Sequence, residues 1–241
     1  MPTSQKIRAI LFDLDGTLLL SKPRMNDILA KFATEYQSPA TQGNRYNAER
    51  WLHYYWADSA ESQFDFEKYG ELGIRFWENH TRRYLVAYGF TPDQAENYAP
   101  EIYRRMSTEY EPHPWIPPDV FDVLGNLKEA GYTLGIVSNR FSPLDDELKK
   151  CGLDMYISFH LVAGEVNSWK PDTRIFLEAV LRLKLTPAEA CYVGDNYYSD
   201  VIGARNAGLR PVLFDPDRVF PEAECDVIHK ISDLVDLPLL H

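Results

Sequence analysis

The sequence predicts an α/β protein in which a parallel sheet is covered by helices on both faces and is interrupted by a long helical insertion. After residue 115, short runs of strand-forming residues alternate with amphipathic segments, as they do in repeated strand–helix units. Between residues 22 and 114 no comparable Val/Ile run occurs, and aromatic residues recur at helical spacing. We therefore expect a core of residues 1–21 and 115–241 and a helical segment of residues 22–114.

The elements of the core follow from apolar runs and from the residues that end them. Ile7–Leu14 is a short apolar run of the kind found in buried parallel strands. Further strands are expected at Tyr132–Val137, Tyr156–Val162, Ala190–Val193, Pro211–Phe214 and, at an edge, Val227–Ile231. Helices are expected at Asp119–Ala130, Pro143–Cys151, Thr173–Leu185 and Asp200–Ala207. Glycine directly follows the first, second and fourth of these helices, which is typical of a helix end.

The insertion has the pattern of a helical subdomain. One helix face is marked by aromatic and imidazole side chains four residues apart, at Phe76, His80, Tyr84 and Tyr88. Thr91 followed by Pro92 is typical of a helix start. We expect most of the aromatic residues to form the core of the subdomain, although they could also stack on a base or line an apolar leaving-group pocket. Its arginines could contact an anionic substrate, but exposed helix arginines are the ordinary case.

The composition narrows the classes of partner. The 241 residues carry 36 Asp and Glu against 25 Lys and Arg, a net charge of −11, which argues against binding nucleic acid or an anionic membrane surface through phosphate contacts. A phosphorylated substrate stays possible, because a metal ion can invert the local charge. The three cysteines show no CxxC spacing, so neither a disulfide framework nor a zinc site is expected. The apolar stretch Ala9–Leu20 contains Asp13 and Asp15 and cannot be a signal or a membrane span, so we expect a cytoplasmic protein.

Two aspartates at the end of the first strand are the strongest chemical signal. Asp13-Leu14-Asp15-Gly16-Thr17 directly follows the apolar run, and alternation along an extended chain points Asp13 and Asp15 the same way. Gly16 then permits a sharp turn. A single aspartate here would be a turn or capping residue, but this pattern at a strand end favours a functional site.

Polar groups also follow three later strands. Ser138-Asn139 follows the strand that ends at Val137, Lys170 comes after the strand near Phe159, and Gly194–Asp200 follows the strand that ends at Val193. Each of these alone is an ordinary loop feature. Because the carboxyl ends of parallel strands meet at one edge of a sheet, all four features are expected to converge on one crevice.

In this combination the sequence resembles the haloacid dehalogenase superfamily, and in particular its Mg²⁺-dependent phosphatases. Asp13-Leu14-Asp15-Gly16-Thr17 is similar to motif I, Ser138 to motif II, Lys170 to motif III, and Asp195 with Asp200 to motif IV. The resemblance covers about Lys6–Leu20 and Pro117–Asp217 and implies a Rossmann-like core. The insertion occupies the position of the C1 cap, which implies closure over the crevice, with hinges near Leu18–Pro23 and Pro112–Pro117.

The resemblance also implies roles for the motif residues. Asp13 is the expected nucleophile that forms an aspartyl-phosphate, and Asp15 the acid that protonates the leaving alcohol and later the base that activates water. Ser138, Asn139 and Lys170 are expected to bind the phosphoryl group. Mg²⁺ is the implied cofactor, held by the carboxylates of Asp13 and Asp195, by the backbone carbonyl of Asp15, and by Asp200 directly or through a second shell.

Several alternatives to this phosphatase stay open at this stage. Asp15 argues against a dehalogenase, which needs no acid for a halide, and a cap with few lysines (Lys31 and Lys68 inside it) argues against a phosphonatase. A phosphomutase shares the same motifs, and a non-catalytic binding module would not need all of them intact. The expected partner is a small phosphorylated metabolite such as phosphoglycolate, a sugar phosphate or a nucleoside monophosphate, and a homodimer is possible. Arg140 is a departure, because relatives often carry Gly there.

Overall fold

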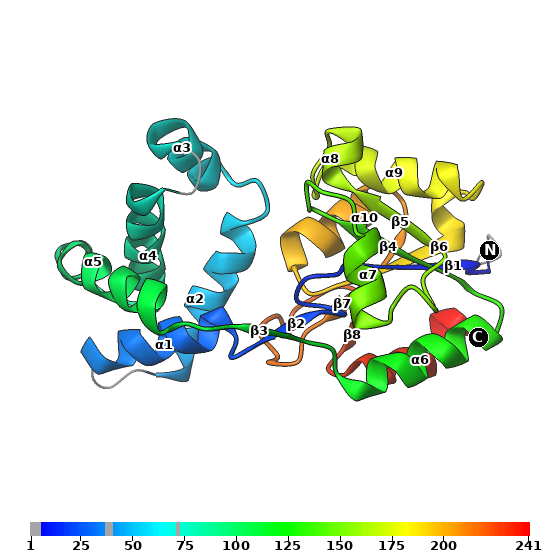
Figure 1. The fold of residues 1–241 in the computed structure, drawn as a ribbon, viewed down its shortest axis with the longest axis horizontal. Coiled ribbons are helices and arrows are strands. Elements are labelled where there is room, and N and C mark those ends of the chain that lie inside the picture. The colour runs from blue at the N-terminus through cyan, green and yellow to red at the C-terminus, as the bar shows by residue number, and fades with distance from the viewer. Residues whose placement is uncertain (1–5, 37–40, 71–72) are drawn as a thin grey trace. The chain divides into compact units, whose positions relative to one another are not determined.

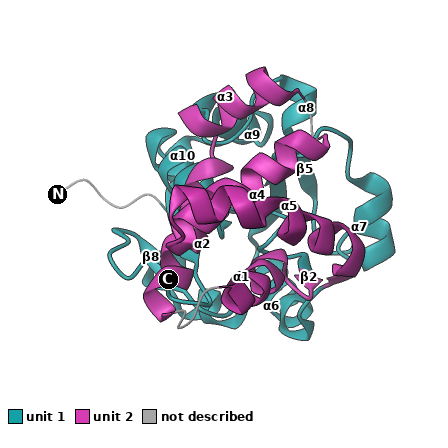
Figure 2. Cartoon of the chain, turned by 90° about the vertical axis from the view of Figure 1, so that its left-hand side faces the viewer, with its two compact units in different colours: residues 1–20, 116–241 teal, residues 21–115 magenta. Residues whose placement is uncertain are grey.

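The computed structural model describes residues 6–36, 41–70 and 73–241, and the chain divides into two compact units (Figure 1). The core unit comprises the residues up to Leu20 together with Ile116–His241, and the cap unit comprises Ser21–Trp115 (Figure 2). Each unit has its own hydrophobic core. No helix among the described residues has the length and apolar character that crossing a membrane requires.

A parallel sheet forms the centre of the core unit. Its described strands run in the order β5-β4-β1-β6-β7-β8. They are β1 (Ala9–Phe12), β4 (Thr133–Ser138), β5 (Phe159–Val162), β6 (Ala190–Gly194), β7 (Arg210–Phe214) and β8 (Asp226–Ile228). In register, Ala9 of β1 lies beside Thr133 of β4 on one side and beside Ala190 of β6 on the other. The strand order reverses at β1, so the carboxyl ends of β1, β4 and β6 border the position where such sheets bind ligands.

Apolar alternation places one hydrophobic layer on each face of this sheet. Ile10 and Phe12 belong to the cluster that contains residues of α6, whereas Ala9 and Leu11 belong to the cluster that contains residues of α9. The two helices therefore cover opposite faces, as Figure 1 shows. The described α-helices of the core unit are α6 (Pro118–Glu129), α7 (Asp145–Cys151), α8 (Ala163–Val166), α9 (Thr173–Arg182) and α10 (Gly203–Asn206). The expected Rossmann-like α/β fold is confirmed.

Several predicted boundaries in the core were wrong for local reasons. The strand expected from Tyr156 begins only at Phe159, because the N–H groups of Tyr156 and Ile157 both bond back to the Leu153 carbonyl in a turn. The helix expected to reach Leu185 ends at Arg182, and Lys184 adopts a positive φ of 57° beyond it. The helix expected from Asp200 starts earlier, as a π-helical segment at Tyr197–Ile202 that is capped by the Asn196 side chain.

The cap unit is helical, as the aromatic spacing predicts. Its described helices are α1 (Met25–Tyr36), α2 (Gln42–Tyr55), α3 (Ala60–Tyr69), α4 (Ile74–Tyr88) and α5 (Pro92–Glu109). The Thr91 side chain accepts a hydrogen bond from the Gln94 N–H and so caps α5, as expected. Tyr84 and Tyr88 are buried in the cap core. The two segments expected to be hinges contain short strands, β2 (Leu20–Lys22) and β3 (His113–Trp115), which pair in a two-stranded sheet that the sequence did not indicate.

Candidate active site

The loop after β1 brings the first aspartate motif against the loop after β6. The Asp13 N–H continues the ladder by donating to the Val193 carbonyl at 2.8 Å. Gly16 adopts a φ of 89°, and a Cβ at this position would lie 2.5 Å from Oδ2 of Asp195. The Thr17 hydroxyl donates to Oδ1 of Asp195 at 3.2 Å. The turn thus requires glycine twice over, for its backbone conformation and for the close approach of Asp195.

The ammonium group of Lys170 contacts two of the aspartates, Asp13 and Asp200. Its Nζ lies 2.8 Å from Oδ1 of Asp13, 2.7 Å from Oδ1 of Asp200 and 2.8 Å from the hydroxyl of Tyr192. The three N–H donors of the ammonium therefore each have an acceptor. The Tyr192 hydroxyl in turn donates to the Val137 carbonyl at 2.7 Å, which ties this arrangement to β4.

The backbone of Lys170 is held by Asn139. The Lys170 N–H donates to Oδ1 of Asn139 at 2.6 Å, and Nδ2 of Asn139 donates to the Lys170 carbonyl at 3.0 Å. The amide side chain of Asn139 therefore joins the loop after β4 to the segment between α8 and α9. The phosphate contact expected of Asn139 stays a prediction, whereas its positioning of Lys170 is visible in the structure.

Three carboxylates gather at this edge of the sheet. The side chains of Asp13, Asp195 and Asp200 each place an oxygen within 4.8 Å of the others. Oδ2 of Asp200 accepts a hydrogen bond from the Asn196 N–H at 2.9 Å, and a Cβ on Gly194 would collide with the Asp200 carboxylate. The strand end and the π-helical segment thus hold Asp200 in place.

The charges of these carboxylates are not balanced within the chain. Burial raises the pKa of Asp13 to about 7, an effect that Lys170 opposes and the Asp200 charge reinforces. Burial, together with the charges of Asp200 and Asp13, raises the pKa of Asp195 well above its usual range. Burial lowers the pKa of Lys170, but the neighbouring Asp13 and Asp200 outweigh it and hold that pKa well above its usual value. A set of hard oxygen donors with uncompensated negative charge fits a divalent cation.

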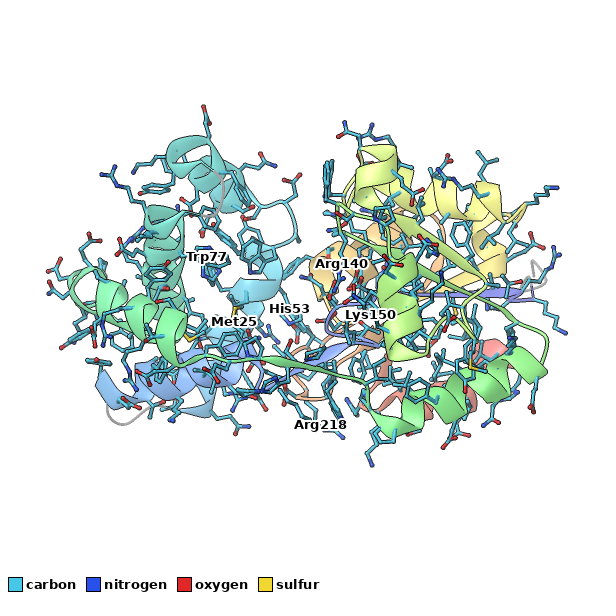
Figure 3. The ribbon with its side chains drawn as sticks, in the orientation of Figure 1. Met25, His53, Trp77, Arg140, Lys150 and Arg218 are labelled. Carbon is cyan, nitrogen blue, oxygen red and sulfur yellow. The ribbon has the colours of Figure 1, made fainter. Side chains whose placement is uncertain are left out.

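Asp15 has a different environment from Asp13. Its carboxylate accepts two parallel hydrogen bonds from Arg140, at 2.7 Å from Nε and at 2.6 Å from Nη2. Ser138, at the buried end of β4, accepts a hydrogen bond from the Arg140 N–H at 3.3 Å. Arg140 lies in the loop after this strand (Figure 3). The sequence marks Arg140 only as a departure from the Gly that relatives often carry, and its pairing with Asp15 was not predicted. The signal for it is that β1 and β4 are neighbours in the sheet, which brings the loops that follow them together.

Comparison with known proteins identifies the family. Residues 7–208 match the family described as haloacid dehalogenase-like hydrolase. The chain belongs to this family. The hydrolase is 30% identical to a phosphoserine phosphatase of Thermus thermophilus, over 95% of this chain and 96% of that protein. It is 29% identical to (S)-2-haloacid dehalogenase 4A of Burkholderia cepacia, over 97% and 95% of the two chains.

Solved structures show the same family likeness. The crystal structure of a HAD phosphatase from Thermococcus onnurineus superimposes on the hydrolase with a TM-score of 0.56 and 25% sequence identity, covering 95% of this chain and 97% of that one. The resemblance predicted from the four motifs is thereby confirmed at the level of the family.

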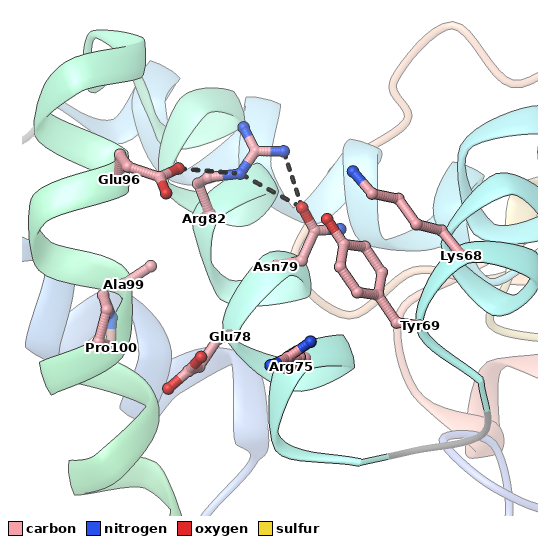
Figure 4. A pocket seen from close by; sticks show the side chains of 9 residues that line it. All are labelled: Lys68, Tyr69, Arg75, Glu78, Asn79, Arg82, Glu96, Ala99 and Pro100. Atoms are coloured by element: carbon pink, nitrogen blue, oxygen red, sulfur yellow. Dashed lines mark hydrogen bonds and ion pairs between the residues drawn. The ribbon is translucent and has the colours of Figure 1, made fainter.

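The cap unit of the hydrolase contains a cavity of its own, of about 400 Å³. Its walls come from α3, α4 and α5, and Arg82 bridges the cavity side chains by donating to Asn79 at 2.8 Å and pairing with Glu96 at 3.6 Å (Figure 4). The cavity therefore differs from the carboxylate centre, because it combines cationic and anionic side chains, of which Arg82 and Glu96 pair with one another.

Proposed function

We propose that this hydrolase is a Mg²⁺-dependent phosphatase that cleaves a small phosphate monoester through an aspartyl-phosphate on Asp13. The proposal rests on one observation, which is that the two carboxylates of motif I, Asp13 and Asp15, have different surroundings. Asp13 belongs to the three-carboxylate cluster beside Lys170, whereas Asp15 stands outside this cluster and is paired with Arg140. One carboxylate thus belongs to the cluster that fits a cation, and the other lies apart from it, which supports different roles for the two in the proposed reaction. The relatives named as phosphatases support the same reaction.

The chain's own residues would divide the first half of the reaction between them. Lys170, 2.8 Å from Asp13, favours the ionised nucleophile. The Asp13 oxygen attacks phosphorus, the bond from phosphorus to the leaving oxygen breaks, and Asp15 donates its proton to that oxygen. Ser138, at the buried end of β4, donates its hydroxyl to a phosphoryl oxygen. Bound by Asp13, Asp195, Asp200 and the Asp15 carbonyl, Mg²⁺ would supply the positive charge that lets an anionic nucleophile meet an anionic ester.

In the second half, Asp15 acts in the opposite direction. Having lost its proton to the alcohol, it takes one from a water molecule that attacks the phosphorus of the aspartyl-phosphate. This attack releases inorganic phosphate and restores the Asp13 carboxylate. Tyr192 and Asn139 keep Lys170 in position during both halves through the hydrogen bonds described above.

The experiment that tests the proposal is hydrolysis of p-nitrophenyl phosphate and of a broad panel of phosphate monoesters. We expect turnover that requires Mg²⁺, disappears with EDTA and falls by about 10⁴-fold or more in Asp13→Asn, which removes the nucleophile. Asp146→Asn, in the exposed first turn of α7, is the matched control and should retain wild-type activity. Sustained turnover by Asp13→Asn, or no turnover of any ester by the wild type, would refute the phosphatase.

Two further assays separate the neighbouring reactions. A phosphomutase would exchange isomers in the presence of a bisphosphate without net release of phosphate. A dehalogenase would release halide from a 2-haloacid in EDTA. Either result would replace the proposed reaction by another one on the same Asp13.

A further inference from the structure

The contact between Arg140 and Asp15 engages both oxygens of the Asp15 carboxylate. Nε of Arg140 donates to one carboxylate oxygen and Nη2 to the other, in the parallel geometry that makes such pairs strong. Asp15 is the strongest contributor to the raised pKa of the Arg140 guanidinium. The remaining Nη1 pairs with Glu147 of α7, so each arm of the guanidinium has an acceptor.

This pairing restrains the carboxylate that is proposed to transfer a proton to the leaving oxygen. To protonate a leaving oxygen, the carboxylate must carry a proton on an oxygen that points at the substrate. Each Asp15 oxygen accepts one hydrogen bond from the guanidinium, and the two parallel bonds fix the orientation of the carboxylate against Arg140. To turn toward a leaving oxygen, the carboxylate must give up at least one of these two hydrogen bonds, so the observed arrangement is a resting one.

An anionic group is the natural exchange partner for the guanidinium. Carboxylates and phosphates match its planar fork, so that an ion pair given up with Asp15 can be replaced by an equivalent one. The Arg140 side chain is one third exposed and the Asp15 side chain half exposed, whereas Lys170 is buried. Arg140 can therefore receive a ligand. Its pairing with Glu147 keeps the guanidinium near the site when Asp15 is released.

We propose that Arg140 recognises an anionic group on the alcohol half of the substrate and, by moving onto it, releases Asp15 for proton transfer. This inference rests on the proposed phosphatase function and specifies its substrate class: phosphate monoesters whose leaving alcohol carries a carboxylate or a second phosphate. A neutral alcohol has no anion that could replace Asp15 as the partner of Arg140. Its reaction must therefore separate the Arg140–Asp15 ion pair without forming a new one.

The test uses substrates that differ only in this anion. Glycerol 3-phosphate and 3-phosphoglycerate form the carboxylate arm, and 1,3-propanediol monophosphate and bisphosphate form the phosphate arm. We expect the wild-type kcat/KM to favour the anionic member of at least one arm by about 10- to 100-fold, the range that one charged hydrogen-bonded contact provides. The arm that shows the preference identifies the anion.

Variants of Arg140 then assign the preference to this residue. Arg140→Gln should reduce the preference to less than about 3-fold, by lowering kcat/KM for the anionic ester and raising it for the neutral one, because the restraint on Asp15 is gone. Arg140→Lys, which keeps the charge but not the fork, should fall in between. Arg182→Gln is the matched control, since Arg182 also joins two carboxylates, Glu165 and Glu178, and it should keep the wild-type preference.

The outcomes distinguish this inference from the proposed function. Equal losses on both members of an arm in Arg140→Gln would overturn the inference, since they are what a merely structural arginine produces. Wild-type hydrolysis of p-nitrophenyl phosphate without any preference for anionic esters would also overturn it and would leave the phosphatase intact. A wild-type protein that hydrolyses no phosphate ester with Mg²⁺ would refute both.

Discussion

The core unit and the cap unit both bury carboxylates, but they neutralise them differently. In the cap, Asp65 is fully buried, lies 2.7 Å from Nε of Arg83 and accepts a hydrogen bond from the Tyr55 hydroxyl at 3.1 Å. In the core, Asp13, Asp195 and Asp200 share the positive charge of Lys170. The cap carboxylate is balanced where it stands, whereas the core carboxylates are not.

The consequence appears in the pKa values. Burial, opposed by Lys170, leaves the pKa of Asp13 raised to about 7, so the ionised form is disfavoured as long as no cation joins it. The carboxylates beside Arg83 raise the pKa of its guanidinium despite burial, so the charged pair is the stable form. Complete local pairing indicates a structural role and incomplete pairing a functional one, because an unbalanced buried charge persists only where a ligand can balance it.

The largest effect that we expect from this difference between the two units is a loss of activity on substitution of Lys170. Lys170→Met removes the cation of the core cluster while keeping an unbranched side chain that is one atom shorter. We expect kcat to fall by about a thousand-fold, because the nucleophile loses the charge that favours its ionised form. Phosphate release under saturating substrate measures this. Lys150→Met, on an exposed position of α7 (Figure 3), should lose less than about two-fold, and a loss in Lys170→Met no larger than ten-fold would contradict the role assigned to this ammonium.

The second effect concerns stability rather than chemistry. Asp65→Asn breaks the buried pair with Arg83 and is expected to lower the free energy of unfolding by about 3 kcal/mol. Because the cap pair is structural, kcat of the folded variant should stay within about two-fold of wild type. Urea unfolding followed by tryptophan fluorescence gives the first quantity. Glu96→Gln is the control, because the exposed Glu96 side chain pairs with Arg82 at 3.6 Å, and it should lower the free energy of unfolding by less than about 1 kcal/mol. A similar loss of stability in both variants would contradict the structural role assigned to the buried Asp65–Arg83 pair.

The smallest effect is a pH dependence of the cap. His80 is buried among Trp51, Tyr55, Trp56 and Trp77, with ring centroids 4.9 to 5.5 Å away. Burial, with the nearby Arg83 charge, lowers the pKa of His80 to about 3. Between about pH 6.5 and pH 3 the unfolded chain therefore binds a proton at His80 that the folded chain does not, so stability falls as the pH falls.

From pH 7.5 to pH 5, this difference amounts to about 2 kcal/mol. His80→Phe keeps an aromatic ring in the cluster and removes the titration, so its stability should vary less over this range by that amount. Urea unfolding at the two pH values measures the difference. His113→Gln, at an exposed position, should keep the wild-type dependence, and an unchanged dependence in His80→Phe would show that other groups cause it.

Most strands of the core unit could be predicted from the sequence, because their local pattern is simple. Buried parallel strands are continuous apolar runs, and polar residues directly after such runs must lie at one edge of the sheet. This local rule was sufficient to place Asp13 at that edge. Lys170 and Asp200 lie further from their strands, after α8 and within the π-helical segment, and it is the structure that brings both within hydrogen-bonding distance of each other and Lys170 within 2.8 Å of Asp13. The cap core was readable in the same way, since aromatic residues four apart share a helix face.

The exact boundaries of the strands and the partners of individual side chains could not be predicted from local patterns. The late start of β5 depends on a turn that closes on Leu153, and the pairing of β2 with β3 joins residues about ninety positions apart. Tyr192 looked like one more apolar strand residue, yet its hydroxyl connects Lys170 to β4. The Tyr192 contact depends on a side chain that reaches from β6 past β1 to β4, and the other two depend on a turn and on the pairing of distant segments. Alternation along a strand encodes none of these.

The sequence by itself thus determined the fold class, the interruption by a helical segment and the set of polar residues at the strand ends, because each depends on local hydrophobic periodicity. Only the tertiary structure decided which of these residues are balanced and which are not. It placed Lys170 between Asp13 and Asp200, and Arg140 on Asp15, 125 positions away along the chain. Charge balance is a property of distances in space, and these are determined by how the strands pair and how their loops meet.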